Sequence, residues 1–168
     1  MISYRLAAVA DIQSAAAVHI ESCLDIYRAV AAEAVESGRL ETSLKAIWAE
    51  ERLTGGDFIV LAEEDGKVIG LSTVRPAKYE TPYIDHFHIR PTLKRGGIGR
   101  GLIAATFAEL RRRGLLAVWL DVAVGNDAAL AFYRAMGGVP GETVTGDLFG
   151  TPVPAIVVRW DDLPNRGR

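Results

Sequence analysis

The stretch Pro91-Thr92-Leu93-Lys94-Arg95-Gly96-Gly97-Ile98-Gly99-Arg100-Gly101 joins a predicted strand to a predicted helix. Proline cannot donate to a strand ladder, so Pro91 ends the strand, and the glycines permit a tight turn into the helix. A turn of this kind aims several backbone N–H groups, together with the positive end of the helix, at one point in space. The segment therefore predicts an anion-binding cradle at a helix start.

Other uses of a glycine-rich turn can be compared with this one. A P-loop needs Lys and then Ser or Thr after its last glycine, whereas Leu102 follows Gly101. A dinucleotide-binding fingerprint needs a final glycine within a βαβ unit, and residues 97–102 lack it. A glycine-rich helix start that binds nothing has the same spacing and stays open. Spacing alone thus supports an anion site and no specific ligand.

In the residues that flank this segment, apolar side chains recur with two different periods. Residues 83–89 alternate between apolar and polar side chains, which predicts a strand. Residues 98–113 place most of their apolar side chains on one helical face, and Gly114 ends that helix behind three arginines. The cradle therefore lies between a strand and an amphipathic helix.

The rest of the chain alternates between strands and helices. The remaining predicted elements are a strand at 2–6, a long alanine-rich helix that Asp11 caps and Gly38 breaks, a helix ending at Gly55-Gly56, a hairpin of strands 58–62 and 67–74 around Asp65-Gly66, a strand at 115–124, a helix at 128–136 capped by Asn126, and strands at 142–149 and 153–160. This order predicts a mixed α/β domain with a central sheet.

Composition limits the class of protein. With 168 residues, of which 49% are hydrophobic, the chain fits a single domain over residues 1–168 with a loose tail at 163–168. The single cysteine, Cys23, cannot form an internal disulfide, and no secretory signal opens the chain. No apolar run approaches the ~18 residues needed to cross a bilayer. We therefore expect a cytoplasmic protein without a membrane partner.

Charge is uneven along the chain. The formal net charge of −2 argues against a nucleic-acid partner, which would call for a basic excess over one face. Residues 94–113 nevertheless carry six basic side chains against Glu109 alone. A basic island in a mildly acidic protein fits a small anionic ligand better than a long polyanion.

Two motifs resemble those of the GNAT superfamily of N-acetyltransferases. Residues 91–99 are similar to the family pattern of Pro, two residues, Gln or Arg, two residues, then Gly-Ile-Gly, although Lys94 stands where Gln or Arg is usual. Residues 126–133 look like the family's Asn…Ala…Phe-Tyr helix, although Gly138 replaces the common aromatic after it. The resemblance extends over essentially the whole chain. It implies an α/β (α+β) fold with a mostly antiparallel sheet of about seven strands, splayed between strands 4 and 5, and about four helices.

The resemblance also implies acetyl-coenzyme A as co-substrate, without a metal. On this interpretation, main-chain groups of the 83–89 strand pair with the pantetheine arm, the glycine-rich turn holds the pyrophosphate, and Tyr133 lies close to the thioester sulfur. The predicted coenzyme-binding residues are Phe87, His88, Ile89, Lys94, Arg95, Gly96, Gly97, Ile98, Gly99, Arg100, Gly101, Asn126 and Tyr133.

Acetyl transfer by direct attack needs a base for the amine and an acid for the departing thiolate. The family resemblance favours Tyr133 as the acid; a purely structural core aromatic is the alternative. Asp85 and His86 are the candidate bases, and a β-bulge would change which of them faces the site. His86 and His88 form a possible metal pair, but no further ligand follows at useful spacing, so zinc is not expected.

The acceptor is predicted to be a primary amine of a small molecule. A peptide or protein amine, at an N-terminus or a lysine, is the alternative, and so is a non-catalytic acyl-coenzyme A sensor. An unrelated α/β scaffold would bind no coenzyme. A homodimer through the apolar run at 153–160 is possible, although that strand could equally be internal. The candidate acceptor contacts are Tyr27, Arg28, Glu33, Trp48, Arg75, Glu80 and Tyr83.

Overall fold

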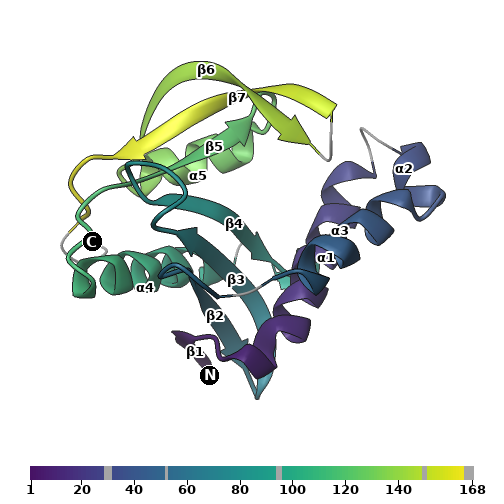
Figure 1. Ribbon diagram of the computed structural model, residues 1–168, viewed down its shortest axis with the longest axis horizontal. Coiled ribbons are helices and arrows are strands. Elements are labelled where there is room, and N and C mark those ends of the chain that lie inside the picture. Colours follow the sequence, from purple (N-terminus) through teal and green to yellow (C-terminus); the bar gives the residue numbers. More distant parts are fainter. Residues whose placement is uncertain (29–31, 52, 94–95, 149–150, 165–168) are drawn as a thin grey trace.

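A seven-stranded sheet in the order β1-β2-β3-β4-β5-β7-β6 organises the molecule (Figure 1). The computed structural model describes residues 1–28, 32–51, 53–93, 96–148 and 151–164. The strands are β1 Ile2–Leu6, β2 Phe58–Glu64, β3 Lys67–Arg75, β4 Tyr83–Ile89, β5 Val118–Ala123, β6 Val139–Leu148 and β7 Thr151–Trp160. All neighbouring strands are antiparallel except β4 and β5, which are parallel. The predicted mixed sheet is confirmed.

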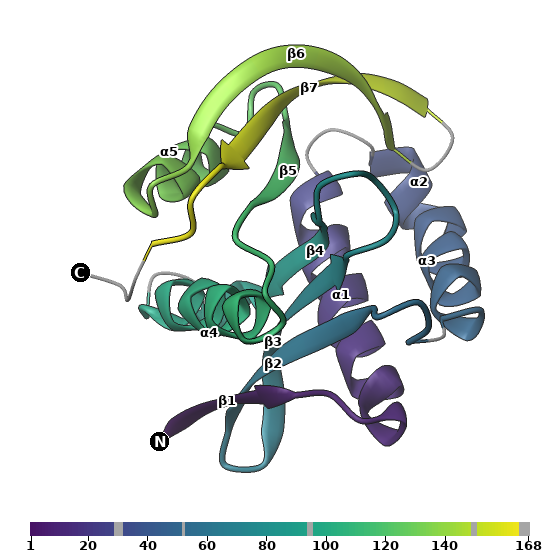
Figure 2. The same cartoon turned by 60° about the vertical axis from the view of Figure 1, so that its left-hand side comes forward.

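Helices cover both faces of this sheet (Figure 2). They are α1 Ile12–Tyr27, α2 Ala32–Glu36, α3 Arg39–Ala49, α4 Ile98–Arg112 and α5 Asp127–Ala135. Apolar side chains of α1 and α3 form a core with β2 and β3, whereas those of α4 and α5 fill the core on the opposite face. The described chain thus has five α-helices, one more than expected, because the long helix predicted before Gly38 is divided into α1 and the short α2.

The sheet opens between β4 and β5. The two strands share one register pair, Tyr83 with Trp119, and the N–H of Trp119 donates to the carbonyl of Pro82 at 3.0 Å. Beyond this pair the described residues of β4 and β5 do not pair with each other, and the ribbons diverge toward the start of α4. The predicted splay between strands 4 and 5 is therefore confirmed, and Tyr83–Trp119 marks its closed end, called here the vertex.

A β-bulge at Asp85 sets the facing of the β4 side chains. Thr73 pairs with His86 and Val74 with Ile84, so Asp85 is the extra residue of β4. Ile84 consequently packs in the core with α4, whereas His86 contacts side chains from α1 and α3. Without the bulge these two residues, two apart in sequence, would share a face.

Several boundaries differ from the sequence-based expectation. Strand β5 begins at Val118 and β6 at Val139, and β7 is internal, so β6 forms the sheet edge. Asp11 precedes α1, but its carboxylate accepts the N–H of Ala8 at 2.7 Å and makes no cap hydrogen bond to α1.

The predicted loose tail from residue 163 is wrong at its first position. Leu163 is 4% exposed in the α4 core, and its N–H donates to the carbonyl of Leu116 at 2.9 Å. Burial of this side chain fixes the chain past the last strand. Residues 165–168 lie outside the described part. Among the helices of the described chain, none is long and apolar enough to span a membrane.

Candidate active site

The glycine-rich turn leads into α4 as predicted. Gly97 is the N-cap residue with a φ of 77°, a left-handed conformation that favours glycine, and a Cβ there would have no atom within 4 Å. The N–H groups of Ile98 and Gly99 open the helix, where no intrahelical acceptor exists. An anion in front of Gly97 would thus meet open space and backbone donors. Lys94 and Arg95, two of the predicted cradle residues, lie outside the described residues.

Gly99 and Gly101 are needed for packing. A Cβ on Gly99 would lie 3.2 Å from Cδ1 of Ile89 and 3.3 Å from Cζ of Phe132, and a Cβ on Gly101 would lie 2.0 Å from the Tyr4 hydroxyl oxygen. The Gly101 N–H donates to the carbonyl of Gly97 at 3.3 Å. Gly101 is therefore required by its contact with Tyr4, and its N–H is already used within the helix.

Strand β4 offers an open edge beside this cradle. Phe87, His88 and Ile89 pair with β3 on one side, and on the β5 side the described chain provides no partner strand beyond the vertex. An unpaired strand edge presents N–H and C=O groups that can pair with amides of another molecule. The predicted pantetheine-binding residues therefore lie on such an edge.

Asn126 and Tyr133 come from α5, on the face of the sheet that carries α4. The Asn126 side-chain oxygen accepts the N–H of Ala129 at 3.2 Å, so this residue caps α5 as predicted. Tyr133 is 7% exposed, and its ring lies 5.9 Å from the ring of Phe87 and 5.9 Å from that of Trp160. Burial raises the pKa of the Tyr133 phenol. The phenol therefore keeps its proton at neutral pH.

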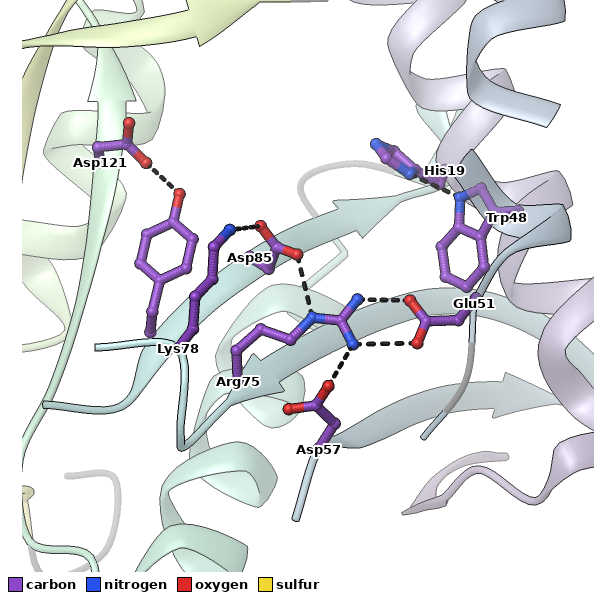
Figure 3. A network of polar contacts seen from close by, with 9 residues as sticks. His19, Trp48, Glu51, Asp57, Arg75, Lys78, Asp85 and Asp121 are labelled. Carbon is purple, nitrogen blue, oxygen red and sulfur yellow. Dashed lines mark hydrogen bonds and ion pairs between the residues drawn. The ribbon is translucent and has the colours of Figure 1, made fainter. Parts of the chain in front are cut away.

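Asp85 is held by two cations. Its carboxylate accepts from Nε of Arg75 at 3.1 Å and from Nζ of Lys78 at 3.4 Å (Figure 3). Burial works to raise the pKa of this carboxyl, but His86, Lys78 and Arg75 outweigh burial and hold the pKa below its usual range. A carboxylate in this state is a poor proton acceptor at neutral pH.

Arg75 stands at the centre of a buried ion cluster. Its guanidinium pairs with Glu51 and lies 2.8 Å from Asp57 and 3.1 Å from Asp85, while only 14% of its side chain is exposed. These contacts tie the segment after α3 to the start of β2 and to β4. Because Arg75 already has three carboxylate partners, it is not placed to bind a carboxylate on the acceptor.

A cluster of three histidines forms where α1 faces β4. The His19 ring lies 4.3 Å from that of His86 and 4.3 Å from that of His88, and Trp48 Nε1–H donates to His19 Nδ1 at 2.9 Å. His88 Nδ1 lies 3.1 Å from the Ser22 hydroxyl oxygen. His19 was not among the predicted site residues, because residues that lie on separate elements give no spacing signal.

Two of the three rings, His19 and His86, have lowered pKa values. Within the described chain, His86 Nδ1 is buried without a hydrogen-bond partner. Burial is the largest cause that lowers the pKa of both His86 and His19, since a charged imidazole there would lose its hydration. Both imidazoles are therefore neutral at pH 7, and His86 has an available nitrogen lone pair or N–H.

Metal ligation by this cluster conflicts with its hydrogen bonding. His19, Cys23 and His88 bring potential ligand atoms within 4.8 Å of one another. Trp48, however, donates to His19 Nδ1, so the neutral ring carries its proton on Nε2, the nitrogen left for a metal. Burial also raises the pKa of the Cys23 thiol to about 12. Both protonation states oppose ligation.

Acidification should lower the stability of the fold, because His19 is buried as a neutral imidazole. Unfolding lets the imidazole recover a pKa of about 6.5, so the unfolded state binds more protons below that pH and stability falls as pH drops. From pH 7 to pH 5, His19 alone should lower the free energy of unfolding by about 2 kcal/mol. Urea denaturation of the wild type and His19→Gln across this range checks the sign. Parallel pH profiles for the two proteins would contradict it.

Aromatic residues surround the vertex. The Tyr83 hydroxyl donates to the Asp121 carboxylate at 2.5 Å, and the Tyr83 ring lies 4.5 Å from Trp119 and 5.4 Å from Tyr79. Burial, followed by the Asp121 hydrogen bond, raises the pKa of Tyr83. Asp121 was not among the predicted site residues, although its alternation with buried β5 residues marks it as facing away from the α4 core.

Comparison with known proteins places these features in a family. Residues 20–137 match the model of the acetyltransferase (GNAT) family. The chain belongs to this family. The match contains the β4 edge, the glycine-rich turn and the helix of Tyr133, so the resemblance seen in the two motifs is confirmed.

Individual relatives share shorter regions. The [ribosomal protein bS18]-alanine N-acetyltransferase of Escherichia coli (strain K12) is 39% identical over 49 residues, which cover 29% of this chain and 33% of that protein. Mycothiol acetyltransferase of Paenarthrobacter aurescens (strain TC1) is 30% identical over 105 residues, which cover 60% of this chain and 32% of that protein. The chain thus spans about a third of the length of these curated relatives.

Solved structures share the fold over nearly the whole chain. The ribosomal-protein-S18-alanine N-acetyltransferase from E. coli superposes with a TM-score of 0.72 at 17% identity, covering 99% of this chain and 97% of that one. The PaiA N-acetyltransferase from Thermoplasma acidophilum, in complex with coenzyme A, gives a TM-score of 0.69 at 19% identity, covering 93% and 98%. At these identities the similarity shows the fold alone.

Proposed function

We propose that this protein is an N-acetyltransferase that moves an acetyl group from acetyl-coenzyme A to a primary amine. The observation that carries the proposal is the open edge of β4 beside the N-terminus of α4, with Gly97 at φ 77° and no atom where its Cβ would be. Backbone N–H groups at a helix start bind phosphate, and an unpaired strand edge binds amides. Coenzyme A carries both groups in one molecule.

The direction of β4 supports a proposed position for the acetyl group. The pyrophosphate would lie at the α4 end of the strand, and the pantetheine arm would follow Phe87, His88 and Ile89 back toward the vertex. The thioester would then lie close to Tyr133, whose ring contacts that of Phe87. Asn126 and the remaining predicted residues of the turn, except Gly101 whose N–H donates within α4, would complete the coenzyme site, with main-chain groups as the principal donors.

Tyr133 and His86 are assigned the acid and base roles. The amine nitrogen bonds to the carbonyl carbon, the C–S bond breaks, and the thiolate takes its proton from Tyr133 while the amine gives its proton to His86, directly or through water. His86 is favoured over Asp85 because it is neutral and has an unpartnered buried nitrogen among the described residues, whereas Asp85 is paired with two cations. The two groups lie on opposite faces of β4, which lets the amine and the sulfur approach from different sides.

We assign the acceptor amine to the N-terminus of a protein in preference to a small molecule. The sequence alone favoured a small molecule, but the relatives named above include enzymes that act on an alanine of a ribosomal protein, as their names state. A second relative is named for mycothiol, a small molecule, so both classes belong in the test.

Calorimetry followed by thiol release tests the proposal. Acetyl-coenzyme A should bind the purified chain, and peptides with an N-terminal alanine should release thiol faster than a panel of small primary amines. Faster turnover of small amines would return the assignment to a small-molecule acceptor. Binding without turnover on either panel would favour the non-catalytic sensor, and absence of binding would refute both readings.

Gly97→Ala should weaken coenzyme binding, because its new Cβ would stand where the pyrophosphate approaches. Gly114 at the other end of α4 is a matched control, since it also has a φ of 77° and no atom within 4 Å of a Cβ. Each alanine should cost about 1–2 kcal/mol of stability through its left-handed conformation. Calorimetry should show lower affinity for Gly97→Ala alone. Equal affinities in the two variants would refute this placement of the pyrophosphate.

A further inference from the structure

Lys78 places an ammonium group at the vertex of the sheet. This residue lies in the connection between β3 and β4, and its Nζ is 5.0 Å from the centroid of the Tyr83 ring and 5.6 Å from that of Tyr79. The same Nζ lies 3.4 Å from the Asp85 carboxylate. Figure 3 shows the end of Lys78 directed toward Asp85, with Asp121 on the other side of Lys78. One cation therefore has two aromatic faces and one carboxylate as neighbours.

The surroundings of this cation are suited to a positively charged group. Tyr79 lies 5.1 Å from Trp119, which itself lies against Tyr83, so the three rings form one continuous cluster. An aromatic face attracts a cation through its quadrupole. The Asp121 carboxylate, bonded to the Tyr83 hydroxyl at 2.5 Å, adds negative charge behind that ring.

The position of the Lys78 ammonium group matches the position expected for the acceptor amine. The proposed path of the pantetheine arm ends near the vertex, and Tyr83 is the residue of β4 that forms the vertex. Asp85 lies two residues further along β4, beside the candidate base His86. An ammonium group next to Asp85 is therefore at the end of the strand toward which the thioester points.

We propose that Tyr79, Tyr83 and Asp85 form a binding site for the primary ammonium group of the acceptor, and that Lys78 fills this site as an internal substitute. The assignment to the acceptor rests on the proposed acetyltransferase function, whereas the ammonium site itself does not. The ligand class is a primary alkylammonium, because the carboxylate selects an N–H donor and the rings select a positive charge.

Displacement of Lys78 requires few changes. Its side chain is 45% exposed, so the ammonium can turn into solvent without disturbing the core. Asp85 keeps Arg75 as a partner at 3.1 Å when Lys78 leaves. An incoming ammonium group thus replaces one cation by another, and the charge balance of the site is preserved.

NMR of the full chain labelled at lysine Cε tests the site with n-butylammonium chloride as the probe. The Lys78 signal is identified by its loss in Lys78→Met, and millimolar n-butylammonium should shift it as the Tyr83 ring is vacated. The Lys45 signal, from an exposed lysine paired with Glu41 on α3, should not move. Butan-1-ol, which has a similar shape without the charge, should move neither signal.

Removing the internal cation should also tighten binding of the probe. If Lys78 occupies the site about nine-tenths of the time, Lys78→Met lowers the apparent Kd for n-butylammonium about tenfold. Lys45→Met should bind like the wild type. A Lys78 signal that moves no more than that of Lys45, an equal response to butan-1-ol, or equal Kd values in the two variants would each overturn the site.

A turnover measurement separates this inference from the proposed function. With an N-terminal alanine peptide and saturating acetyl-coenzyme A, Lys78→Met should lower KM for the peptide, and Lys45→Met should not. An unchanged KM would refute the acceptor role of the site. Failure of acetyl-coenzyme A to bind would instead refute the acetyltransferase function, while displacement of Lys78 by n-butylammonium would still establish the ammonium site.

Discussion

Arg75→Met is expected to lower the free energy of unfolding by about 3–5 kcal/mol. The guanidinium of Arg75 pairs with Glu51, Asp57 and Asp85, and the side chain of Glu51 is only 5% exposed. Removing the cation leaves three carboxylates close together in a partly buried place, where each loses hydration and repels the others. Methionine keeps most of the volume, so the loss measured is chiefly electrostatic.

Arg5→Met is the matched control for this effect. Arg5 also bridges two carboxylates, at 2.7 Å from Asp11 and 2.6 Å from Glu63, but 41% of its side chain is exposed. Exposed ion pairs contribute about 0–1 kcal/mol because water and salt screen them. Urea denaturation at pH 7 should therefore show a much larger loss for Arg75→Met. Similar losses in the two variants would mean that the Arg75 cluster is effectively solvated.

The pH dependence of the stability loss in Arg75→Met provides a second test of this prediction. Asp85 has a lowered pKa in the folded protein, with Arg75 among the causes, so its ion pairing stabilises the fold above the unfolded pKa of about 3.9 and is lost as pH falls. In Arg75→Met the carboxyl groups should protonate more readily. The difference in stability between the variant and the wild type should therefore shrink from pH 7 to pH 4.

Tyr133→Phe is expected to lower kcat about 100-fold or more, which is the range for loss of a general acid. The phenol keeps its proton because burial raises its pKa. This proton is available to a thiolate that forms beside it. The affinity for acetyl-coenzyme A should change little, since the proposed cradle at the start of α4, and not Tyr133, would hold the pyrophosphate.

Stability and a control variant separate chemistry from structure in this prediction. The ring of Tyr133 packs between Phe87 and Trp160, and phenylalanine preserves that packing, so the melting temperature should stay near that of the wild type. Tyr4→Phe removes a hydroxyl that donates to the carbonyl of Ile98 at 3.3 Å, and it should leave kcat unchanged. An unchanged kcat in Tyr133→Phe would remove the phenol from the mechanism.

The histidines show how much of the site lies beyond sequence reasoning. His86 and His88 could be predicted as site candidates because they alternate on one short strand. His19 could not, because it reaches them from α1, and the neighbouring contact of His88 with Ser22 spans 66 residues of sequence. Their facing also depends on the bulge at Asp85, which follows from the pairing of β4 with β3 and not from either strand alone.

Sequence by itself determined the elements whose cause is local. Pro91 ends a strand, Gly97 supplies the left-handed residue that starts α4, and Asn126 caps α5, because each of these depends on backbone chemistry within a few residues. The order of strands and helices, and the proposed anion cradle between β4 and α4, follow from such signals. Gly101 shows the limit, since its need for a small residue comes from Tyr4 on the distant strand β1.

Only the tertiary structure decided which charged and aromatic side chains meet. Arg75 pairs with Glu51, 24 residues away in sequence, and Tyr83 bonds to Asp121, 38 residues away. The aromatic cluster beside Lys78 joins two strands at the vertex. Such contacts depend on strand order and register, which bring together residues that no periodic pattern connects. The proposed anion cradle at the start of α4 could therefore be predicted from local sequence, whereas the proposed site for the amine depends on the tertiary fold.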